Sequence, residues 1–123
     1  MEQTNMHDLA LTAARSRLLA MEMVHRAASG HIGGPLSAMD ILTELYFRVM
    51  RVNPEQPRDP ARDRFVLSKG HCTPALYPTL AQRGFFPVER LKEFRRIDGQ
   101  MSGHAEMHHV PGVDMSTGSL GQG

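Results

Sequence analysis

Only one short segment of the 123-residue chain has the pattern of a β-strand. Residues 65–67, the apolar run "FVL", lie between a charged stretch and the glycine of "SKG", and this pattern predicts a buried strand. A single strand has no neighbour with which to pair its backbone groups, so it cannot form a sheet. The fold is therefore either mostly α-helical, or an α/β fold whose other strands lie outside this sequence.

Helical periodicity dominates the segments before that strand. A first helix is expected over residues 6–28, with Asn5 as its cap and Ser29-Gly30 at its end. Its apolar stripe is predicted at Ala10, Ala14, Leu18, Met21, Val24 and Ala28. A second helix is expected to begin near Pro35. Its core face is predicted at Ala38, Leu42, Leu45 and Val49, with Ile41 beside them.

Two more helical segments and two loops complete the expected organisation. Residues 73–84 return to helical spacing and close at Gly84, and residues 87–97 are expected to form a short amphipathic helix. Residues 53–64 hold three prolines and alternating charges, which is typical of a surface linker. From Asp98 onward no periodicity remains, so we expect a loop region. With no internal repeat, residues 1–123 are interpreted as one incomplete domain.

Composition argues against several classes of function. Lys plus Arg is 14 and Asp plus Glu is 13, and the resulting net charge of +1 does not favour nucleic acid or an anionic membrane. No window approaches the roughly 20 apolar residues that span a bilayer. The first residues lack the basic and apolar segments of a secretory signal. The single cysteine, Cys72, fits a reducing compartment, so a cytoplasmic protein is expected.

Three Gly-His pairs are the first candidates for chemistry. They end at His31, His71 and His104, and all three lie in predicted loops. Histidine titrates near neutral pH and can move protons, and a preceding glycine leaves room for a ligand beside the imidazole. The second pair follows the predicted strand, where ligands bind in open α/β sheets. Residues 68–71 are therefore interpreted as a site for an anionic ligand.

The stretch "GHAEMHH" gives an alternative interpretation, a small histidine-rich metal binder. His104, Glu106, His108 and His109 are all residue types that ligate zinc. Their order is not the His-Glu-x-x-His pattern of zinc proteases, and Pro111-Gly112 opposes a long helix there. Zinc uptake that disappears when His104 and His108 are replaced by alanine is the expected sign of this alternative.

Four stretches carry a family resemblance: "SGHIGGPLSAMDIL", "RDRFVLSKGHCTPALYPTLAQRG", "GQMSGHAE" and "PGVDMSTGSLGQG". In their order and approximate spacing they resemble the N-terminal, thiamine diphosphate-binding part of transketolase, from Ser29 to Gly123. Related deoxyxylulose phosphate synthases share the early "GH" loop but resemble the later stretches less closely. The resemblance implies an α/β fold with three layers, a parallel sheet with helices on both faces, of which this chain holds a mostly helical part.

The resemblance also implies an activity. Transketolases transfer a two-carbon glycolaldehyde unit from a ketose phosphate to an aldose phosphate, in the pentose phosphate pathway. They use thiamine diphosphate and a divalent metal, usually Mg²⁺. The cofactor carries out the difficult carbon–carbon chemistry, and the protein supplies positioning and proton transfer.

The matching histidines are the implied catalytic residues. His31 resembles a histidine that donates to the developing oxyanion of the substrate carbonyl or moves its proton. His71 resembles one that contacts the cofactor diphosphate close to the donor sugar. His104 resembles one that binds the donor's terminal hydroxyl group. Gly118 and Leu120 correspond to positions that line the thiazolium and aminopyrimidine rings of the cofactor.

The resemblance further implies that these residues hold only part of the site. The family's Gly-Asp-Gly stretch and downstream asparagine, which hold the metal and the diphosphate, do not occur, and Ala105 stands where proline is usual. We therefore expect no metal ligand in this chain and no activity from it alone. The missing residues are expected from the remainder of the chain or a C-terminal subunit, in a homodimer. The alternative is a truncated, non-catalytic interaction module.

Overall fold

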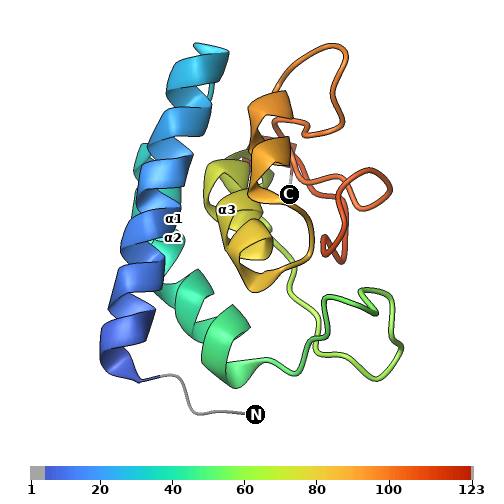
Figure 1. Cartoon of the computed structure of the whole chain (residues 1–123). Helices are drawn as coiled ribbons and strands as arrows, with labels where there is room; N and C mark the ends of the chain where they lie inside the picture. The colour runs from blue at the N-terminus through green and yellow to red at the C-terminus, as the bar shows by residue number, and fades with distance from the viewer. Residues whose placement is uncertain (1–4, 123) are drawn as a thin grey trace.

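Three α-helices set the architecture of residues 5–122, the part of the chain that the computed structural model describes (Figure 1). Helix α1 spans Met6–Ala27, α2 spans Gly33–Glu44 and α3 spans Thr73–Arg83. The α1 helix runs along one side of the molecule, and α3 lies between it and the irregular C-terminal segments (Figure 1). None of the described helices is long and apolar enough to cross a bilayer.

The two ends of α1 have identifiable caps. The side chain of Asn5 accepts a hydrogen bond from the Asp8 amide at 2.9 Å, which confirms the predicted start. At the other end Ala28 adopts the left-handed conformation, with φ 52°, and its amide bonds back to the carbonyls of Val24 and His25. The helix therefore ends before the predicted Ser29-Gly30. Ala28 takes the left-handed position after the helix, which glycine usually fills.

The buried face of α1 differs from the predicted stripe. The buried residues are Leu9, Ala13, Ser16, Ala20 and Met23. Leu18 and Met21 of the predicted stripe are instead more than half exposed, at 58% and 53%. The reason is close packing against α3, because Gln82 of that helix donates to Ser16 Oγ at 2.6 Å and to the carbonyl of Thr12 at 2.9 Å. The small side chain of Ser16, between the apolar residues of the buried face, permits this approach.

Helix α2 begins at Gly33, two residues before the predicted Pro35, and its core face is also rotated. The buried residues are Pro35, Met39, Leu42 and Thr43. Of the predicted face only Leu42 is buried, whereas Ile41 is 65% exposed and Val49 is 56% exposed. The helix continues into a π-helical turn, η1 (Leu45–Val49), which shifts the register and buries Tyr46.

Helix α3 is the centre of the core. Each residue from Thr73 to Ala81 is buried, and Gly84, with φ 107°, ends the helix as predicted. Tyr77 of α3 lies in the same core as Tyr46 and Phe94, and all three residues are almost completely inaccessible to solvent. Because all of its faces are covered, α3 is a fixed support for the loops at either end of it.

The predicted strand at residues 65–67 was wrong. These residues are extended, but the described part of the chain contains no β-strand with which they could pair. The Phe65 amide instead donates to Asp114 Oδ2 at 2.8 Å, and Val66 is 49% exposed. An apolar run gives an extended segment, but a strand requires a partner that these residues do not supply.

The amphipathic α-helix predicted over residues 87–97 was also wrong. A 3₁₀ helix, η3 (Val88–Glu93), forms in its place. Phe94 then turns into the core, and Arg95 adopts the left-handed conformation with φ 57°, which stops the helix. The predicted loop region from Asp98 onward is confirmed up to the short 3₁₀ turn η4 (Leu120–Gln122).

A buried ion pair joins the proline-rich linker to the C-terminal loops. Arg62 Nε lies 2.9 Å from Asp114 Oδ1, and the two side chains are only 9% and 7% exposed. The other carboxylate oxygen of Asp114 binds the Phe65 amide, and Arg62 also donates to the carbonyl of Asp59. The linker was predicted to lie at the surface, but its last residues are thus anchored beside the segment that leads to His71.

Candidate functional site

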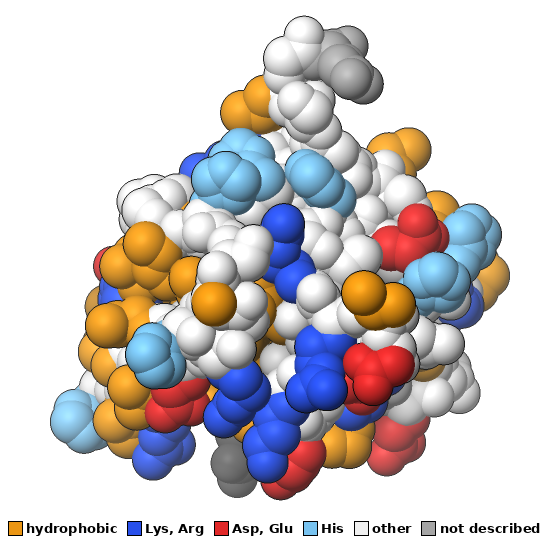
Figure 2. All heavy atoms as spheres, turned by 90° about the horizontal axis from the view of Figure 1, so that it is seen from above, with side chains coloured by type: hydrophobic (Ala, Val, Ile, Leu, Met, Phe, Trp, Pro, Cys, Tyr) orange, Lys and Arg blue, Asp and Glu red, His pale blue; other side chains and the backbone are white. Residues whose placement is uncertain are grey.

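His31 and His71 lie against each other. Their ring centroids are 4.7 Å apart, and the ring planes meet at 62°. His31 belongs to the turn between α1 and α2, and His71 belongs to a 3₁₀ turn, η2 (Gly70–Cys72), that leads into α3. Histidine side chains gather next to one another on the face seen in Figure 2, with basic side chains close by. Two of the three predicted histidines therefore form one cluster.

The turn before His31 depends on glycine and on a neighbouring aromatic ring. Gly30 has φ 130°, a conformation that residues with a Cβ rarely adopt. A Cβ at this position would also lie 3.2 Å from Cε2 of Phe94. The ring of Phe94 thus packs directly on the backbone that presents His31.

The second Gly-His pair holds the C-terminal glycine loop beside it. The Gly70 amide donates to the carbonyl of Gly118 at 3.2 Å. A Cβ at Gly70 would lie 2.7 Å from the Gly118 amide nitrogen and 2.7 Å from Thr117 Oγ1. Because Gly70 has no side chain, the loop at residues 117–118 packs against the turn that carries His71.

The surface of this loop is open to a ligand. A Cβ added at Gly118 would meet no atom within 4 Å, and Leu120 is 53% exposed. The hydroxyl group of Thr117 is buried and has no hydrogen-bond partner within the described residues. Bare backbone and an unpartnered buried hydroxyl next to the turn that carries His71 are features of a binding site.

Cys72, next to His71, is a packing residue. Its thiol is fully buried, and a Cβ at Gly34 of α2 would lie 2.7 Å from the sulfur. Burial raises the pKa of the Cys72 thiol, and the positive charge of Lys69 opposes this only in part. The group therefore stays protonated at neutral pH and is a poor nucleophile.

His104 occupies a neighbouring hollow rather than the His31–His71 contact. This hollow has a volume of about 340 Å³ and is lined by Gly103 and His104 and by Arg95, Arg96 and Ile97. His104 is exposed, whereas Ala105 after it is buried. The third Gly-His pair thus faces solvent beside two guanidinium groups.

The loop that carries His104 is tied to α3 through backbone carbonyls. Tyr77 Oη donates to the Ser102 carbonyl at 2.8 Å and lies 3.2 Å from the His104 carbonyl. Thr73 Oγ1 donates to the Gly103 carbonyl at 2.7 Å. Burial raises the pKa of Tyr77 to about 12, so its hydroxyl keeps its proton and remains a donor at neutral pH. Three successive carbonyls of the loop are thereby fixed.

The metal-binding alternative finds no support in the geometry. Nowhere in residues 5–122 do three or more His, Cys, Asp or Glu side chains converge as a metal site requires. Glu106 instead accepts hydrogen bonds from the His108 amide at 3.0 Å and from Ser116 Oγ at 3.2 Å. The His108 hydrogen bond is the main reason why the pKa of Glu106 lies below its usual value. The carboxylate serves to connect two loops.

Several residues of the site region were missed at the level of sequence. Phe94 packs behind Gly30, Arg95 lies against Gly103, and Tyr77 and Thr73 hold the third loop. Phe94 and Arg95 were assigned to an ordinary amphipathic helix, because helical spacing hides a turn. The only available signal was the glycine before each histidine. A glycine leaves the position of a Cβ empty, and another part of the chain can pack there.

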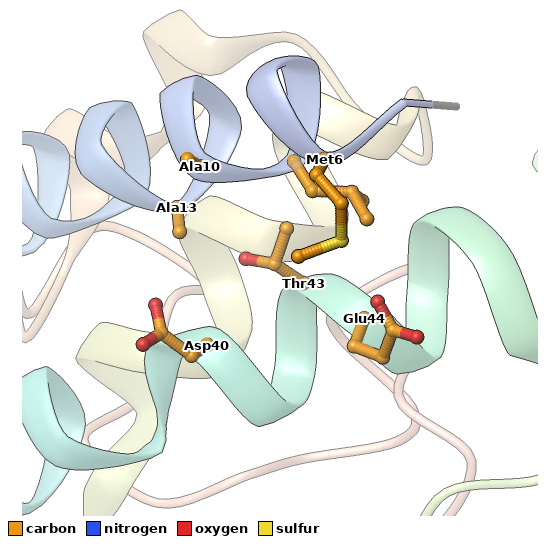
Figure 3. Close-up of a pocket in the computed structure, with 7 residues that line it drawn as sticks. Met6, Ala10, Ala13, Asp40, Thr43 and Glu44 are labelled. Carbon is orange, nitrogen blue, oxygen red and sulfur yellow. The ribbon is translucent and has the colours of Figure 1, made fainter.

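A separate hollow of about 280 Å³ lies between the first turns of α1 and the end of α2 (Figure 3). Apolar residues of α1, including Met6 and Ala13, face Asp40, Thr43 and Glu44 of α2 across it. The two carboxylates are already paired, Asp40 with Arg17 and Glu44 with Arg48. None of the Gly-His loops contributes to this hollow.

Comparison with known proteins gives a consistent result. A family model described as transketolase, thiamine diphosphate binding domain, matches residues 9–123. The chain is 47% identical over 116 residues to the 6-deoxy-6-sulfo-D-fructose transketolase subunit of Clostridium sp. (strain MSTE9), covering 94% of this chain and 42% of the relative. It is 46% identical over 108 residues to the transketolase of Aquifex aeolicus (strain VF5), covering 87% of this chain and 16% of the relative.

Solved structures agree with the sequence relatives. Transketolase from Leishmania mexicana superposes with a TM-score of 0.88 at 34% identity, over 99% of this chain and 18% of that one. Transketolase from Pichia stipitis, in complex with sedoheptulose-7-phosphate, gives 0.85 at 42% identity, over 91% of this chain and 17% of that one. The chain thus spans less than half the length of each of these relatives.

Proposed function

Because the chain belongs to the transketolase family, through its thiamine diphosphate-binding domain, we propose that it forms the N-terminal segment of a transketolase. In that role it takes part in the transfer of a two-carbon glycolaldehyde unit from a ketose phosphate to an aldose phosphate. The observation that carries the proposal is the His31–His71 contact next to the Gly118 loop. These residues lie within the part of the chain that the family model matches.

The residues present fit thiamine diphosphate. The open backbone at Gly118 suits close approach of a flat heterocycle, and the buried hydroxyl of Thr117 has no partner in the described chain. His71 and the half-buried Lys69 supply donors and positive charge for a diphosphate. Bound thiamine diphosphate supplies the nucleophilic carbon and the electron sink for carbon–carbon cleavage. Gly118 and Leu120 are assigned to the rings of the cofactor.

The histidines are assigned to proton transfer and to substrate positioning. His31 donates to the oxygen of the ketose carbonyl, or moves its proton, as negative charge develops there. His71 binds the diphosphate and borders the donor sugar, which fits its contact with His31. His104 binds the terminal hydroxyl group of the donor from its own loop. A neutral imidazole offers both a donor and an acceptor nitrogen, as these roles require.

The proposal places the remaining groups of the site outside these residues. Mg²⁺ is expected to accompany the diphosphate, with its ligands in the remainder of the enzyme. That remainder is either the continuation of the chain or a separate C-terminal subunit, and the Clostridium relative is itself described as a subunit. A cytoplasmic homodimer in the pentose phosphate pathway is the setting we propose, with sugar phosphates as substrates.

Transfer assays on this chain alone, and on the enzyme completed with the remainder described above, test this function. The chain alone is expected to give no turnover, and the completed enzyme is expected to transfer a two-carbon unit from sedoheptulose-7-phosphate to an aldose phosphate. The transfer must depend on added thiamine diphosphate. Turnover by the isolated chain would contradict the claim that the site is incomplete. A completed enzyme that shows no transfer with any sugar phosphate would contradict the proposed reaction.

A further inference from the structure

Arg95 has an unusual backbone conformation directly beside the His104 hollow. Its φ of 57° lies in the left-handed region, where only it and the helix-capping Ala28 are found among the described non-glycine residues. A residue with a Cβ keeps this conformation only when its surroundings enforce it, and such residues concentrate at functional sites. The conformation of Arg95 therefore requires an explanation in terms of its contacts.

The backbone around Arg95 is held from two sides. The Arg95 amide donates to the carbonyl of Met101 at 2.7 Å, which closes the loop between these two residues. Phe94 before it is buried, packs edge-on against Tyr77 with ring centroids 6.3 Å apart, and lies against Gly30. Phe94 thus points into the core while Arg95 points outward at the same turn.

The guanidinium group of Arg95 lies against the backbone of Gly103. A Cβ at Gly103 would overlap Nη1 of Arg95 and would lie 3.2 Å from its Cζ and 3.5 Å from its Cγ. The arginine side chain therefore extends along the vacant face of the glycine that precedes His104. In the described residues no carboxylate forms an ion pair with Arg95, whereas its neighbour Arg96 pairs with Asp98.

The other face of the His104 loop is already fixed. Tyr77 and Thr73 donate to its carbonyls from α3, but they do not restrain its solvent side. The Arg95 side chain lies against Gly103 on that side, and Arg95 and His104 line the same hollow. The loop is thus held between α3 and the guanidinium group.

We propose that Arg95 is a positioning residue for His104, because its guanidinium group packs on Gly103 and sets the direction of the imidazole. This inference rests on the proposed function, in which His104 binds the terminal hydroxyl group of the donor sugar. The left-handed turn at Arg95 is what aims the side chain at Gly103. Arg95 contributes through the position of His104, and we assign it no contact with the substrate.

Two single variants and their combination test the proposal in the completed enzyme. Arg95→Gly allows the left-handed turn, which glycine adopts readily, and removes the whole side chain with its guanidinium group. Gly103→Ala keeps arginine but displaces its guanidinium group, and the backbone of Gly103 does not lie in the left-handed region. Arg15→Ala, which removes an exposed guanidinium group from α1, is the matched control.

The donor kinetics give the first readout. We expect each single variant to lower kcat/KM for the ketose donor by about ten-fold, mainly through KM, because a misplacement of about 1 Å can cost up to about a hundred-fold. The double variant should be no worse than the poorer single variant, because both changes remove the same contact. Arg15→Ala should stay within about two-fold. Normal donor kinetics in either single variant, or losses that multiply in the double variant, would overturn the proposal.

Histidine-selective ¹⁵N spectra of the same proteins give a second readout that does not depend on activity. Arg95→Gly and Gly103→Ala should shift the resonances of His104 and leave those of His25, on the exposed side of α1, unchanged. Unchanged His104 resonances would overturn the positioning role even in an enzyme with no transfer activity. If the resonances of His104 shift in the variants but the wild-type enzyme shows no transfer activity, the positioning role is supported and only the proposed function is contradicted.

Discussion

Single residues determine how the two central histidine loops meet. Gly30 and Gly70 each leave a space that a neighbouring group fills, the Phe94 ring in one case and the loop at residues 117–118 in the other. The sequence predicted the three histidines and these glycines, because a glycine beside a histidine is recognisable in isolation. It did not predict which groups fill the spaces, because those groups come from distant parts of the chain.

Replacing Gly70 by alanine should separate the two loops. The new Cβ would lie 2.7 Å from the Gly118 amide nitrogen and 2.8 Å from the Thr117 carbonyl carbon, and backbone atoms cannot move away without shifting the loop. We expect the free energy of unfolding to fall by about 1–3 kcal/mol, as is usual for overpacking. Denaturant titration of the chain measures this difference.

Gly33→Ala is the matched control for that substitution. A Cβ at Gly33, in the first turn of α2, meets no atom within 4 Å. Alanine also favours helix, so the free energy of unfolding should change by less than about 1 kcal/mol. Equal losses for the two variants would contradict the close approach at Gly70.

The carboxylate of Glu106 gives a prediction about pH. Its pKa is lowered mainly by the hydrogen bond from the His108 amide, with further contributions from Ser116 and from the charges of His108 and His109, while burial acts in the opposite direction. A lowered pKa in the folded state means that the contribution to stability is present above the unfolded pKa. This contribution is lost as the pH falls through the folded pKa.

An NMR titration of the His108 amide tests whether the pKa of Glu106 is lowered. Its chemical shift should change with a midpoint below the ordinary value of a glutamate, 4.5, and Glu106→Gln should abolish the transition. A midpoint above that value would contradict the hydrogen bond between Glu106 and the His108 amide.

At the scale of elements, the helices were predictable but their faces were not. The apolar spacing of α1 is compatible with two neighbouring stripes, and spacing alone does not tell which of them is buried. The structure buries the stripe that holds Ser16, whose hydroxyl group accepts a hydrogen bond from Gln82 of α3. The prediction of a strand at residues 65–67 was wrong for a related reason. Strand pairing depends on a second segment, which the sequence of the first does not reveal.

The Arg62–Asp114 ion pair connects two such segments and should be important for stability. Removing one partner of a buried pair leaves an uncompensated charge, so Asp114→Asn should lower the free energy of unfolding by about 3–5 kcal/mol. Asp98→Asn, which breaks the exposed pair with Arg96, should cost less than about 1 kcal/mol. Denaturant titration of both variants makes the comparison, and similar losses would contradict the anchoring role of Asp114.

At the scale of the whole molecule, the described residues are a mostly helical part of the α/β thiamine diphosphate-binding fold of transketolases, as the sequence resemblance implied. The chain covers 42% of the Clostridium subunit and 16% of the Aquifex transketolase. Its three helices and the loops between them bring His31, His71 and the Gly118 loop together. The groups that complete the site are proposed to lie in the remainder of the enzyme.

The affinity of the completed enzyme for thiamine diphosphate tests the central claim most directly. Titration calorimetry should show that His71→Ala weakens binding by about ten-fold or more, equivalent to about 1.4 kcal/mol. His109→Ala, which changes an exposed histidine outside the His31–His71 contact, should bind like the wild type. Equal affinity of all three proteins, or no binding by the completed wild-type enzyme, would contradict a cofactor site built on His71.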